Sequence, residues 1–233
     1  MSRIELAYGK SKAAADIPWG RPLGVLDIAE TPPLADPAAA VYAALDRPIG
    51  QEGPAFADFQ AGETVCIITS DSFRSTRADQ YLPPLLERLT ARGVRDEDIC
   101  FLIATGTHRG PTEPELDVIL GAGVHARFRG RIFVNDAHNA EEHVELGRTS
   151  RGTPVELDRR AVEADRVIVT GSVVLHYFGG FGGGRKAVLP GIASVESISK
   201  NHSMNLDPEE DRLNPNVAIG KCGGNPVAED MLE

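Results

Sequence analysis

Short apolar runs alternate with amphipathic stretches along most of this chain. The runs at 64–68 and 99–104 contain almost no polar residue, which is typical of strands buried on both faces of a sheet. Between them, leucines recur at the helical period over 79–92, and Gly93 ends that stretch. The pattern predicts strands at 4–8, 64–68, 99–104, 131–134, 154–157 and 166–172, the last one buried, and helices at 36–46, 79–92, 112–120, 159–164 and 194–203.

Strands that alternate with helices of these lengths predict a doubly wound, Rossmann-like α/β fold with a parallel sheet. We expect a strand and helix segment at 1–60 that packs on the core, and an α/β ligand-binding core at 61–233. In such folds, ligands bind beyond the carboxyl ends of the strands. The loops that follow the strands are therefore the first place to look for a site.

Polar and titratable residues follow four of the predicted strands. They occur in the loops at 71–74, 106–109, 135–138 and 171–186. A single polar loop is ordinary, but four such loops at one edge of a sheet predict a binding site held by a rigid scaffold. Asp136 and His138, in the third loop, are the weakest candidates.

The segment 176–202 holds an unusual combination: a histidine, two aromatics, five glycines, Arg185-Lys186, and then a helix with a second histidine. Its spacing does not match a P-loop, and no Ser or Thr follows Lys186. It is also a poor dinucleotide fingerprint, because no helix is expected directly after the glycines. A flexible surface loop is the alternative, although Phe178 and Phe181 argue against it.

Several side chains of these loops have suitable chemistry. His108 and His176, if they face one cleft, form a general acid/base pair, although a lone loop histidine is more often merely polar. Lys186 could act as an amine nucleophile. His202 could bind a metal, but it has no neighbouring protein ligand, so the other ligands must come from elsewhere. Arg74 matches a carboxylate or a phosphate, with a surface salt bridge as the alternative.

Composition narrows the class of protein. The 233 residues carry a net charge of −10 with a pI near 5.1, which disfavours a nucleic-acid partner. The sequence has no run of 18 apolar residues and no signal-peptide pattern, so we expect no membrane partner. Three cysteines without CxxC spacing fit a reducing compartment. The expectation is a soluble cytoplasmic protein.

Together, these motifs resemble a known family. DSFRSTR after the first core strand, GTHRG after the second, and H-x-F-x-G-F-x-G-G-R-K-x-x-x-P-G before a helix with Lys-Asn-His resemble the nickel-pincer lactate racemase family. The resemblance extends from about Tyr8 to the end of the chain. It implies an isomerase that racemises or epimerises a small-molecule 2-hydroxy acid by reversible hydride transfer. The cofactor it implies is a nickel-pincer nucleotide, a pyridinium-3-thioamide-5-thiocarboxylic acid mononucleotide that carries Ni and is made by dedicated biosynthesis enzymes.

The resemblance also implies residue roles. His108 and His176 correspond to the paired catalytic acid/base residues, one for each enantiomer. His202 corresponds to the nickel ligand, and Lys186 to the lysine that holds the cofactor covalently. The other cofactor-binding positions it implies are Asp71, Arg74, Gly180, Gly182, Gly183, Gly184 and Arg185.

Two further features bear on this interpretation. The family usually has a second α/β domain that closes over the site, so we expect this chain to be the N-terminal domain, with its C-terminal partner missing and turnover impaired without it. The first loop reads Phe73-Arg74-Ser75, where lactate-specific members tend to have Thr-Arg-Pro. A racemase of an aryl, dicarboxylic or sugar acid stays open, as does a non-catalytic nucleotide- or anion-binding module.

Overall fold

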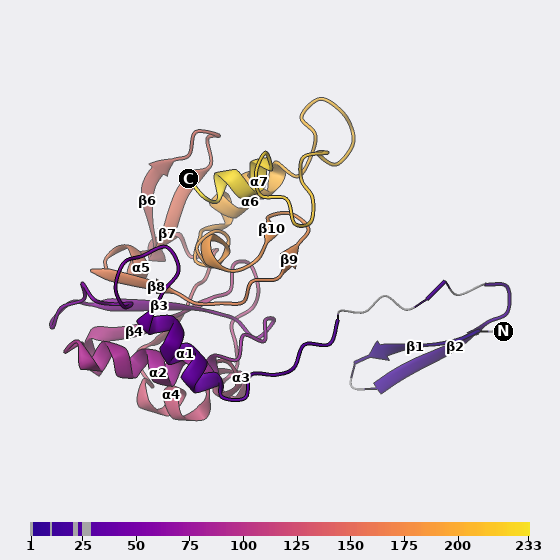
Figure 1. The fold of residues 1–233 in the computed structure, drawn as a ribbon. Coiled ribbons are helices and arrows are strands. Elements are labelled where there is room, and N and C mark those ends of the chain that lie inside the picture. The colour runs from indigo at the N-terminus through magenta and orange to yellow at the C-terminus, as the bar shows by residue number, and fades with distance from the viewer. Residues whose placement is uncertain (1, 10, 21–22, 25–28) are drawn as a thin grey trace. The chain divides into compact units, whose positions relative to one another are not determined.

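The chain divides into two compact units, Met1–Ala35 and Asp36–Glu233. The computed structural model describes residues 2–9, 11–20, 23–24 and 29–233. In the first unit, β1 (Ser2–Tyr8) and β2 (Ser11–Ile17) form an antiparallel hairpin (Figure 1). The strand predicted at 4–8 is confirmed as part of β1. Its partner was missed because β2 contains three alanines, which are poor strand formers.

A four-stranded parallel sheet forms the centre of the second unit. Its spatial order is β5-β4-β3-β8, which confirms the predicted fold class. The strands are β3 (Val65–Ser70), β4 (Ile99–Ala104), β5 (Ile132–Val134) and β8 (Arg166–Val169).

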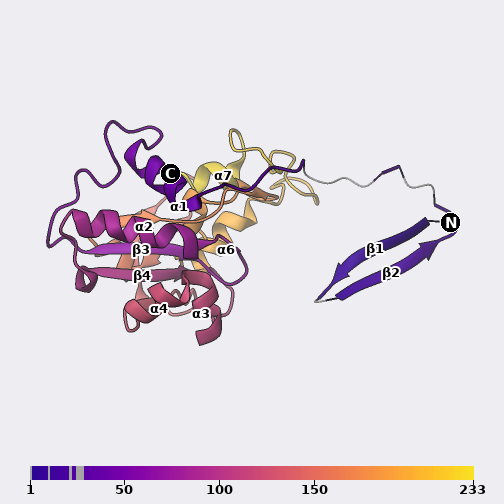
Figure 2. The ribbon, with the colours of Figure 1, turned by 60° about the horizontal axis from the view of Figure 1, so that its bottom comes forward.

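Helices cover one face of this sheet. Val65, Ile67 and Phe101 point into a core that these helices complete with their leucines. Figure 1 shows the helices on one side of the sheet, and in the turned view of Figure 2 the longest helix runs along β3 and β4. They are α2 (Ala78–Ala91), α3 (Glu113–Leu120) and α4 (Ala122–Arg127), and α1 (Pro37–Asp46) packs on α2.

The opposite face packs against the later part of the chain. Cys66, Ile68 and Leu102 meet Ala161 and Ile192 there. Beyond this layer, β6 and β7 pair antiparallel in a separate sheet, and α6 and α7 share a third apolar cluster. The elements are β6 (His143–Arg148), β7 (Pro154–Asp158), α5 (Arg159–Val162), β9 (Leu175–His176), β10 (Gly180–Phe181), α6 (Val195–Ser203) and α7 (Pro226–Asp230), with 3-10 turns η1 (Asp96–Asp98), η2 (Ala140–Glu142) and η3 (Gly184–Ala187).

Three details of the sequence prediction are wrong. The strand at 166–172 ends at Val169 as β8 and is not buried on both faces, because it is an edge strand of the sheet and leaves Val167 and Val169 44% and 38% exposed. The strand at 154–157 pairs with β6 and lies outside the central sheet. A helical turn does follow the glycines directly, since η3 begins at Gly184.

The connections out of β3 and β8 leave the sheet toward opposite faces. The chain after β3 enters α2 on one face, whereas the chain after β8 leads to η3, whose Ala187 packs on the other. Two neighbouring parallel strands whose connections diverge leave a crevice at their carboxyl ends. Among the described residues, no helix is long and apolar enough to span a membrane.

Candidate functional site

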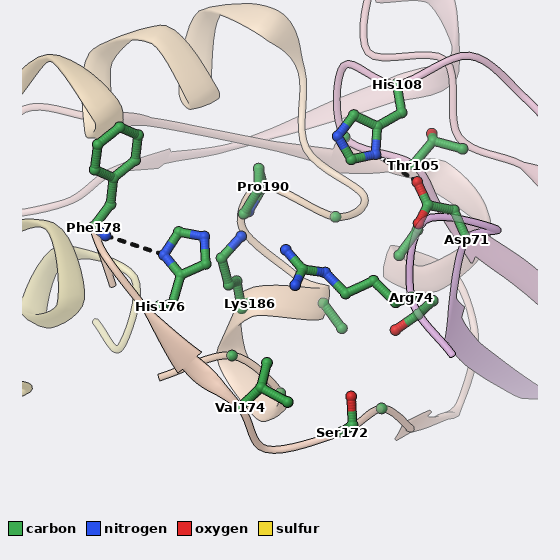
Figure 3. Close-up of a pocket in the computed structure, with 18 of the residues that line it drawn as sticks. Asp71, Arg74, Thr105, His108, Ser172, Val174, His176, Phe178, Lys186 and Pro190 are labelled. Atoms are coloured by element: carbon green, nitrogen blue, oxygen red, sulfur yellow. Dashed lines mark hydrogen bonds and ion pairs between the residues drawn. The ribbon is translucent and has the colours of Figure 1, made fainter. Parts of the chain in front are cut away.

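A cavity of about 300 Å³ lies at this divergence. Its walls come from the loops after β3, β4 and β8, from the glycine-rich segment, and from α6. Figure 3 shows Arg74, His176 and Lys186, which come from separate segments, pointing into one space. The position matches the prediction of a site beyond the carboxyl ends of the strands.

The cavity brings together most of the residues that the sequence pointed to. They come from five different segments, so only the fold places them side by side. The predicted site residues among its lining are Asp71, Arg74, His108, His176, Gly182, Gly183, Lys186 and His202.

Three predicted cofactor-binding residues lie outside this lining. Arg185 donates from Nη2 to the carbonyl of Gly179 at 2.7 Å and so ties the loop to itself. At Gly180 an added Cβ would lie 2.2 Å from the carbonyl oxygen of Lys221, so this glycine permits a close backbone contact. Gly184 has open space around it and begins η3 with a positive φ of 49°.

The loop after β5 also stays outside the cavity, contrary to the expectation that four strand ends share one rim. Because β5 is an edge strand with β4 between it and β3, its end lies away from the β3–β8 divergence. Asn135 is buried there and bonds to His143 at 3.2 Å. Asp136 and His138 form a local turn, in which the backbone N–H of His138 donates to the Asp136 carboxylate.

Asp71 and His108 form a hydrogen-bonded pair at one end of the cavity. Oδ2 of Asp71 lies 2.6 Å from Nδ1 of His108, and the backbone N–H of Phe73 donates to Oδ1 at 3.2 Å. Asp71 is buried, whereas the side chain of His108 is 48% exposed and contacts the ring of Phe73 at a tilt of 50°. The pair thus consists of a buried, fixed carboxylate and an imidazole that can reach a ligand.

His176 is held in a different way. Its Nδ1 accepts hydrogen bonds from the backbone N–H groups of Phe178 and Gly179, both at 3.1 Å. The ring is buried, and this burial lowers its pKa to about 4, with further lowering from the positive charges of Lys186 and Arg74. His176 is therefore a neutral ring near pH 7.

Lys186 is the buried amine of the site. Burial is the main cause that lowers its pKa to about 8, and the charge of Arg74 lowers it further, while Asp71 opposes the change. At neutral pH an appreciable fraction of the amine is then uncharged, and an uncharged amine is a nucleophile. In Figure 3 the ends of Lys186 and Arg74 lie between His176 and the Asp71–His108 pair.

His202 reaches the cavity from α6. Ser194 accepts from the backbone N–H of Ser197 and begins this helix as predicted, which sets the face that His202 occupies. Its Nδ1 is buried, and burial lowers the pKa of the ring, with further lowering from the charge of Lys186, while the backbone of Ile198 opposes the change. The ring meets Phe178 edge-on, with 5.5 Å between the centroids. The lowered pKa favours the neutral imidazole, which is the form that can bind a metal.

Two glycines let the backbone form part of the cavity wall. At Gly183, with φ 77°, an added Cβ would lie 3.0 Å from the carbonyl oxygen of Ser172. At Gly182 it would lie 3.1 Å from a methyl of Val174. A side chain at either position would have to displace the loop after β8.

Sequence reasoning missed several lining residues. Thr105 and Thr170 stand at the ends of β4 and β8, next to residues that were singled out, and their position directly after an apolar run could have revealed them. Tyr177 and Pro190 are also in the lining; both lie in the segment 176–202 that the sequence singled out, but neither was named as a site residue.

The fold and the site define a class of protein: a doubly wound α/β domain with a ligand cavity that contains three histidines and a lysine of lowered pKa. The chain belongs to the lactate racemase N-terminal domain family, whose pattern matches residues 8–213. It is 35% identical over 235 residues to the lactate racemase of Thermoanaerobacterium thermosaccharolyticum and 33% identical over 193 residues to that of Lactiplantibacillus plantarum.

Comparison with solved structures agrees with this family assignment. The lactate racemase apoprotein from T. thermosaccharolyticum superposes with a TM-score of 0.79 at 34% identity over 99% of this chain. A protein from Thermotoga maritima, 22% identical over 84% of this chain, shares the fold with a TM-score of 0.62. The two curated relatives are matched over 100% and 82% of this chain but over only 53% and 43% of their own length, so the chain spans about half of each.

Proposed function

We propose that this chain is the cofactor-holding half of a racemase or epimerase that acts on a 2-hydroxy acid such as lactate. The observation that carries the proposal is the cavity that holds Lys186, with its lowered pKa, together with His108, His176 and His202. Membership of the lactate racemase N-terminal domain family supports it. The rest of the site is proposed to come from a C-terminal domain, in the same polypeptide or another, because the curated relatives are about twice as long.

The residues of the cavity fit a nickel-pincer nucleotide. Lys186 offers the amine that would hold it covalently, and His202 lines the same cavity with a ring whose lone pair would ligate nickel. Among the described residues, no three His, Cys, Asp or Glu side chains group into a metal site, so the remaining nickel ligands would have to belong to the nucleotide. Gly182 and Gly183 let the backbone pack against the loop after β8 and form the wall on which a planar group would lie.

When bound, this group would supply the hydride acceptor and nickel; the chain's own residues supply binding and proton transfer. Arg74 carries the positive charge that would bind the substrate carboxylate, as an arginine fork does. His108, backed by Asp71, is placed to take the hydroxyl proton at Nε2. Loss of that proton favours departure of hydride from the neighbouring carbon, and a 2-keto acid results.

The proposal also includes the compartment of the protein and the source of its cofactor. All three cysteines are free thiols, which fits the cytoplasm. Enzymes that make the pincer nucleotide would have to act in the same compartment.

The test of the proposed function is racemisation of lactate that carries deuterium at C2, with the chain joined to the C-terminal half of a relative and loaded with cofactor. Reversible hydride transfer predicts inverted product that keeps its deuterium in ordinary water. Wash-out of the label at the rate of inversion would indicate proton abstraction from carbon instead. A panel of aryl, dicarboxylic and sugar acids, assayed in the same way, identifies the substrate.

A further inference from the structure

The turn at Phe178 and Gly179 contacts two histidines of the cavity. Its two backbone N–H groups donate to Nδ1 of His176 at 3.1 Å, and Figure 3 shows the bond from Phe178. The phenyl ring of Phe178 meets the His202 ring edge-on, with 5.5 Å between the centroids. The position of this turn therefore sets where the His176 ring lies and where the aromatic neighbour of His202 lies.

Residues outside the turn hold its carbonyl groups. Three consecutive carbonyl oxygens, those of Phe178, Gly179 and Gly180, each accept one hydrogen bond. The donors, in the same order, are Nδ2 of Asn225 at 2.8 Å, Nη2 of Arg185 at 2.7 Å and the backbone N–H of Gly220 at 2.9 Å. Two of the three donors come from residues 220–225, which we call the clamp segment. With both its N–H groups and its carbonyls bonded, the turn has little freedom to move.

Asn225 is the central residue of the clamp segment. Its side chain is fully buried, and its amide makes four hydrogen bonds. Besides the bond to Phe178, Nδ2 donates to the carbonyl of Lys221 at 2.9 Å, and Oδ1 accepts from the N–H groups of Val227 and Ala228 at 3.1 and 3.3 Å. The amide cannot turn without losing some of these bonds. Asn225 thus ties the turn to the start of α7.

Gly180 and Arg185 complete the contact from the other side. Gly180 has a φ of 73°, and an added Cβ would lie 2.2 Å from the carbonyl oxygen of Lys221, so the clamp segment can approach only a glycine. Arg185 donates to the turn and lies 3.4 Å from Sγ of Cys222 in the clamp segment. Both residues were expected to bind the cofactor, and the structure gives each of them a contact within the protein.

We propose that Asn225 is a positioning residue of the site, with Arg185 as its partner. Asn225 fixes the turn through the carbonyl of Phe178, Arg185 fixes it through the carbonyl of Gly179, and the turn in turn fixes the ring of His176. Neither Asn225 nor Arg185 lines the cavity, so both act through the turn and not on a ligand. For its effect on turnover, the proposal rests on the 2-hydroxy acid racemase proposed above.

Amide hydrogen exchange in the cofactor-free chain of 233 residues, followed by NMR, tests the clamp without any turnover. Asn225→Ser keeps an oxygen that can cap α7, but its side chain is too short to reach Phe178. The amides of Phe178 and Gly179 should then exchange about tenfold faster, relative to the core amides of Ile68 and Leu102. Unchanged relative exchange would overturn the proposal.

The control for a general loss of stability is Ile99→Val, which removes a methyl group from the core at the amino end of β4, away from the cavity. It should leave the exchange of the Phe178 and Gly179 amides unchanged relative to the same core amides. Equal acceleration in Ile99→Val and Asn225→Ser would show that the turn responds to any destabilisation, and would also overturn the proposal.

Variants of Arg185 test the second anchor of the turn. Arg185→Met removes the donor to Gly179 but keeps an apolar stem, so the same two amides should exchange faster in the cofactor-free chain. Arg185→Lys keeps a donor that can reach a carbonyl and should restore most of the protection. A role confined to cofactor binding would leave exchange in the cofactor-free chain unchanged in both variants, and that result would contradict the assignment. These variants decide the matter even if Asn225→Ser does not fold.

Turnover of the loaded, completed enzyme gives the functional readout. In Asn225→Ser, displacement of His176 should lower kcat by about tenfold or more, while KM changes by less than about threefold. The adduct on Lys186 should stay complete, because Lys186 lies in η3, outside the turn. Unchanged kcat would show that the turn does not position a catalytic group, and loss of the adduct would show that the clamp segment serves cofactor loading; either result would overturn the proposal. If the unsubstituted holoenzyme does not racemise any 2-hydroxy acid, the proposed function fails, whereas the exchange result stands by itself.

Discussion

Arg74, in the loop after β3, and Lys186, in η3, point into the same cavity, and the charge of Arg74 is one reason why the pKa of Lys186 falls to about 8. Burial of Lys186 is the larger reason. A lysine that must react with an electrophile benefits from both effects, because each one favours the uncharged amine. This relationship connects the position of Arg74 with the reactivity of Lys186.

Arg74→Gln should raise the pKa of Lys186 from about 8 toward its ordinary 10.5 without reaching it, since burial remains. The rate at which an amine-reactive reagent labels Lys186, followed by peptide mass spectrometry across pH, measures this directly. The exposed Lys200 in the same digest is the internal control, and its profile should not move. A Lys186 profile unchanged in the variant would show that Arg74 does not act on it.

The buried His176 should make stability depend on pH between about 6.5 and 4. Its pKa is about 4 in the folded chain and about 6.5 when unfolded, so as pH falls through this window only the unfolded chain takes up the proton and the folded state loses stability. The full difference corresponds to about 3 kcal/mol. Above pH 6.5 this residue contributes no pH dependence.

Urea unfolding of the cofactor-free chain at a series of pH values tests this point. His176→Gln should flatten the loss of unfolding free energy between pH 6.5 and 4, whereas His138→Gln, at an exposed loop histidine, should keep the wild-type profile. The same slope in wild type and His176→Gln would contradict the assignment.

Asp230 joins α7 to the β6–β7 connection and to α6. Its carboxylate accepts from Thr149 and Thr153 at 2.6 and 2.8 Å, and from Nδ2 of Asn201, the neighbour of His202, at 2.8 Å. Asp230→Ala removes three hydrogen bonds and leaves the Thr149 and Thr153 hydroxyls without their acceptor, so we expect a loss of about 3 kcal/mol in unfolding free energy. Denaturant unfolding measures it.

The matched control is Glu163→Ala, which breaks only an exposed i,i+4 pair with Arg159 and should cost less than about 0.5 kcal/mol. Similar losses in the two variants would show that the Asp230 network contributes little.

Gly191 lets the end of the glycine-rich segment lie against β4. An added Cβ would stand 2.1 Å from the carbonyl oxygen of Ala187 and 2.8 Å from the Cβ of Ala104. Gly191→Ala should therefore destabilise the chain by about 2 kcal/mol or more, because the contact is with backbone and cannot relax easily. Gly123→Ala, in α4 with open space around it, should be neutral or stabilising by up to about 1 kcal/mol. Thermal unfolding of both variants measures this difference in stability. Equal unfolding midpoints for Gly191→Ala and Gly123→Ala would contradict the prediction.

The parts of the fold that follow from local pattern were predicted well from the sequence. The strand at 99–104 matches β4 at both ends, because a short unbroken apolar run between polar turns is typical of a buried strand. The helix at 194–203 begins where expected, since Ser194 caps it. Periodicity does not give the spatial order of strands, however. The exposure of Val167 on β8, and the exclusion of the loop after β5 from the cavity, both follow from that order.

The sequence predicted which residues form the candidate site better than it predicted which of them contact one another. Strand-end position and family resemblance pointed to His108, His176, Lys186 and His202, and the cavity contains all four. Asp71 was expected to contact the cofactor, and the structure pairs it with His108, 37 residues away in sequence. No local pattern reveals such a pair, because only the parallel alignment of β3 and β4 brings the two strand ends together.

The proposed function requires that Lys186 holds a nickel-pincer nucleotide with His202 as the protein ligand of nickel. The most direct measurement is intact-protein mass together with metal content, after the chain is produced alongside the cofactor-making enzymes. The account predicts one nucleotide-sized adduct on Lys186 and about one nickel per chain, no adduct in Lys186→Arg, and an adduct with little nickel in His202→Ala. An unmodified, nickel-free wild-type chain under those conditions, beside a relative that does become loaded, would contradict it.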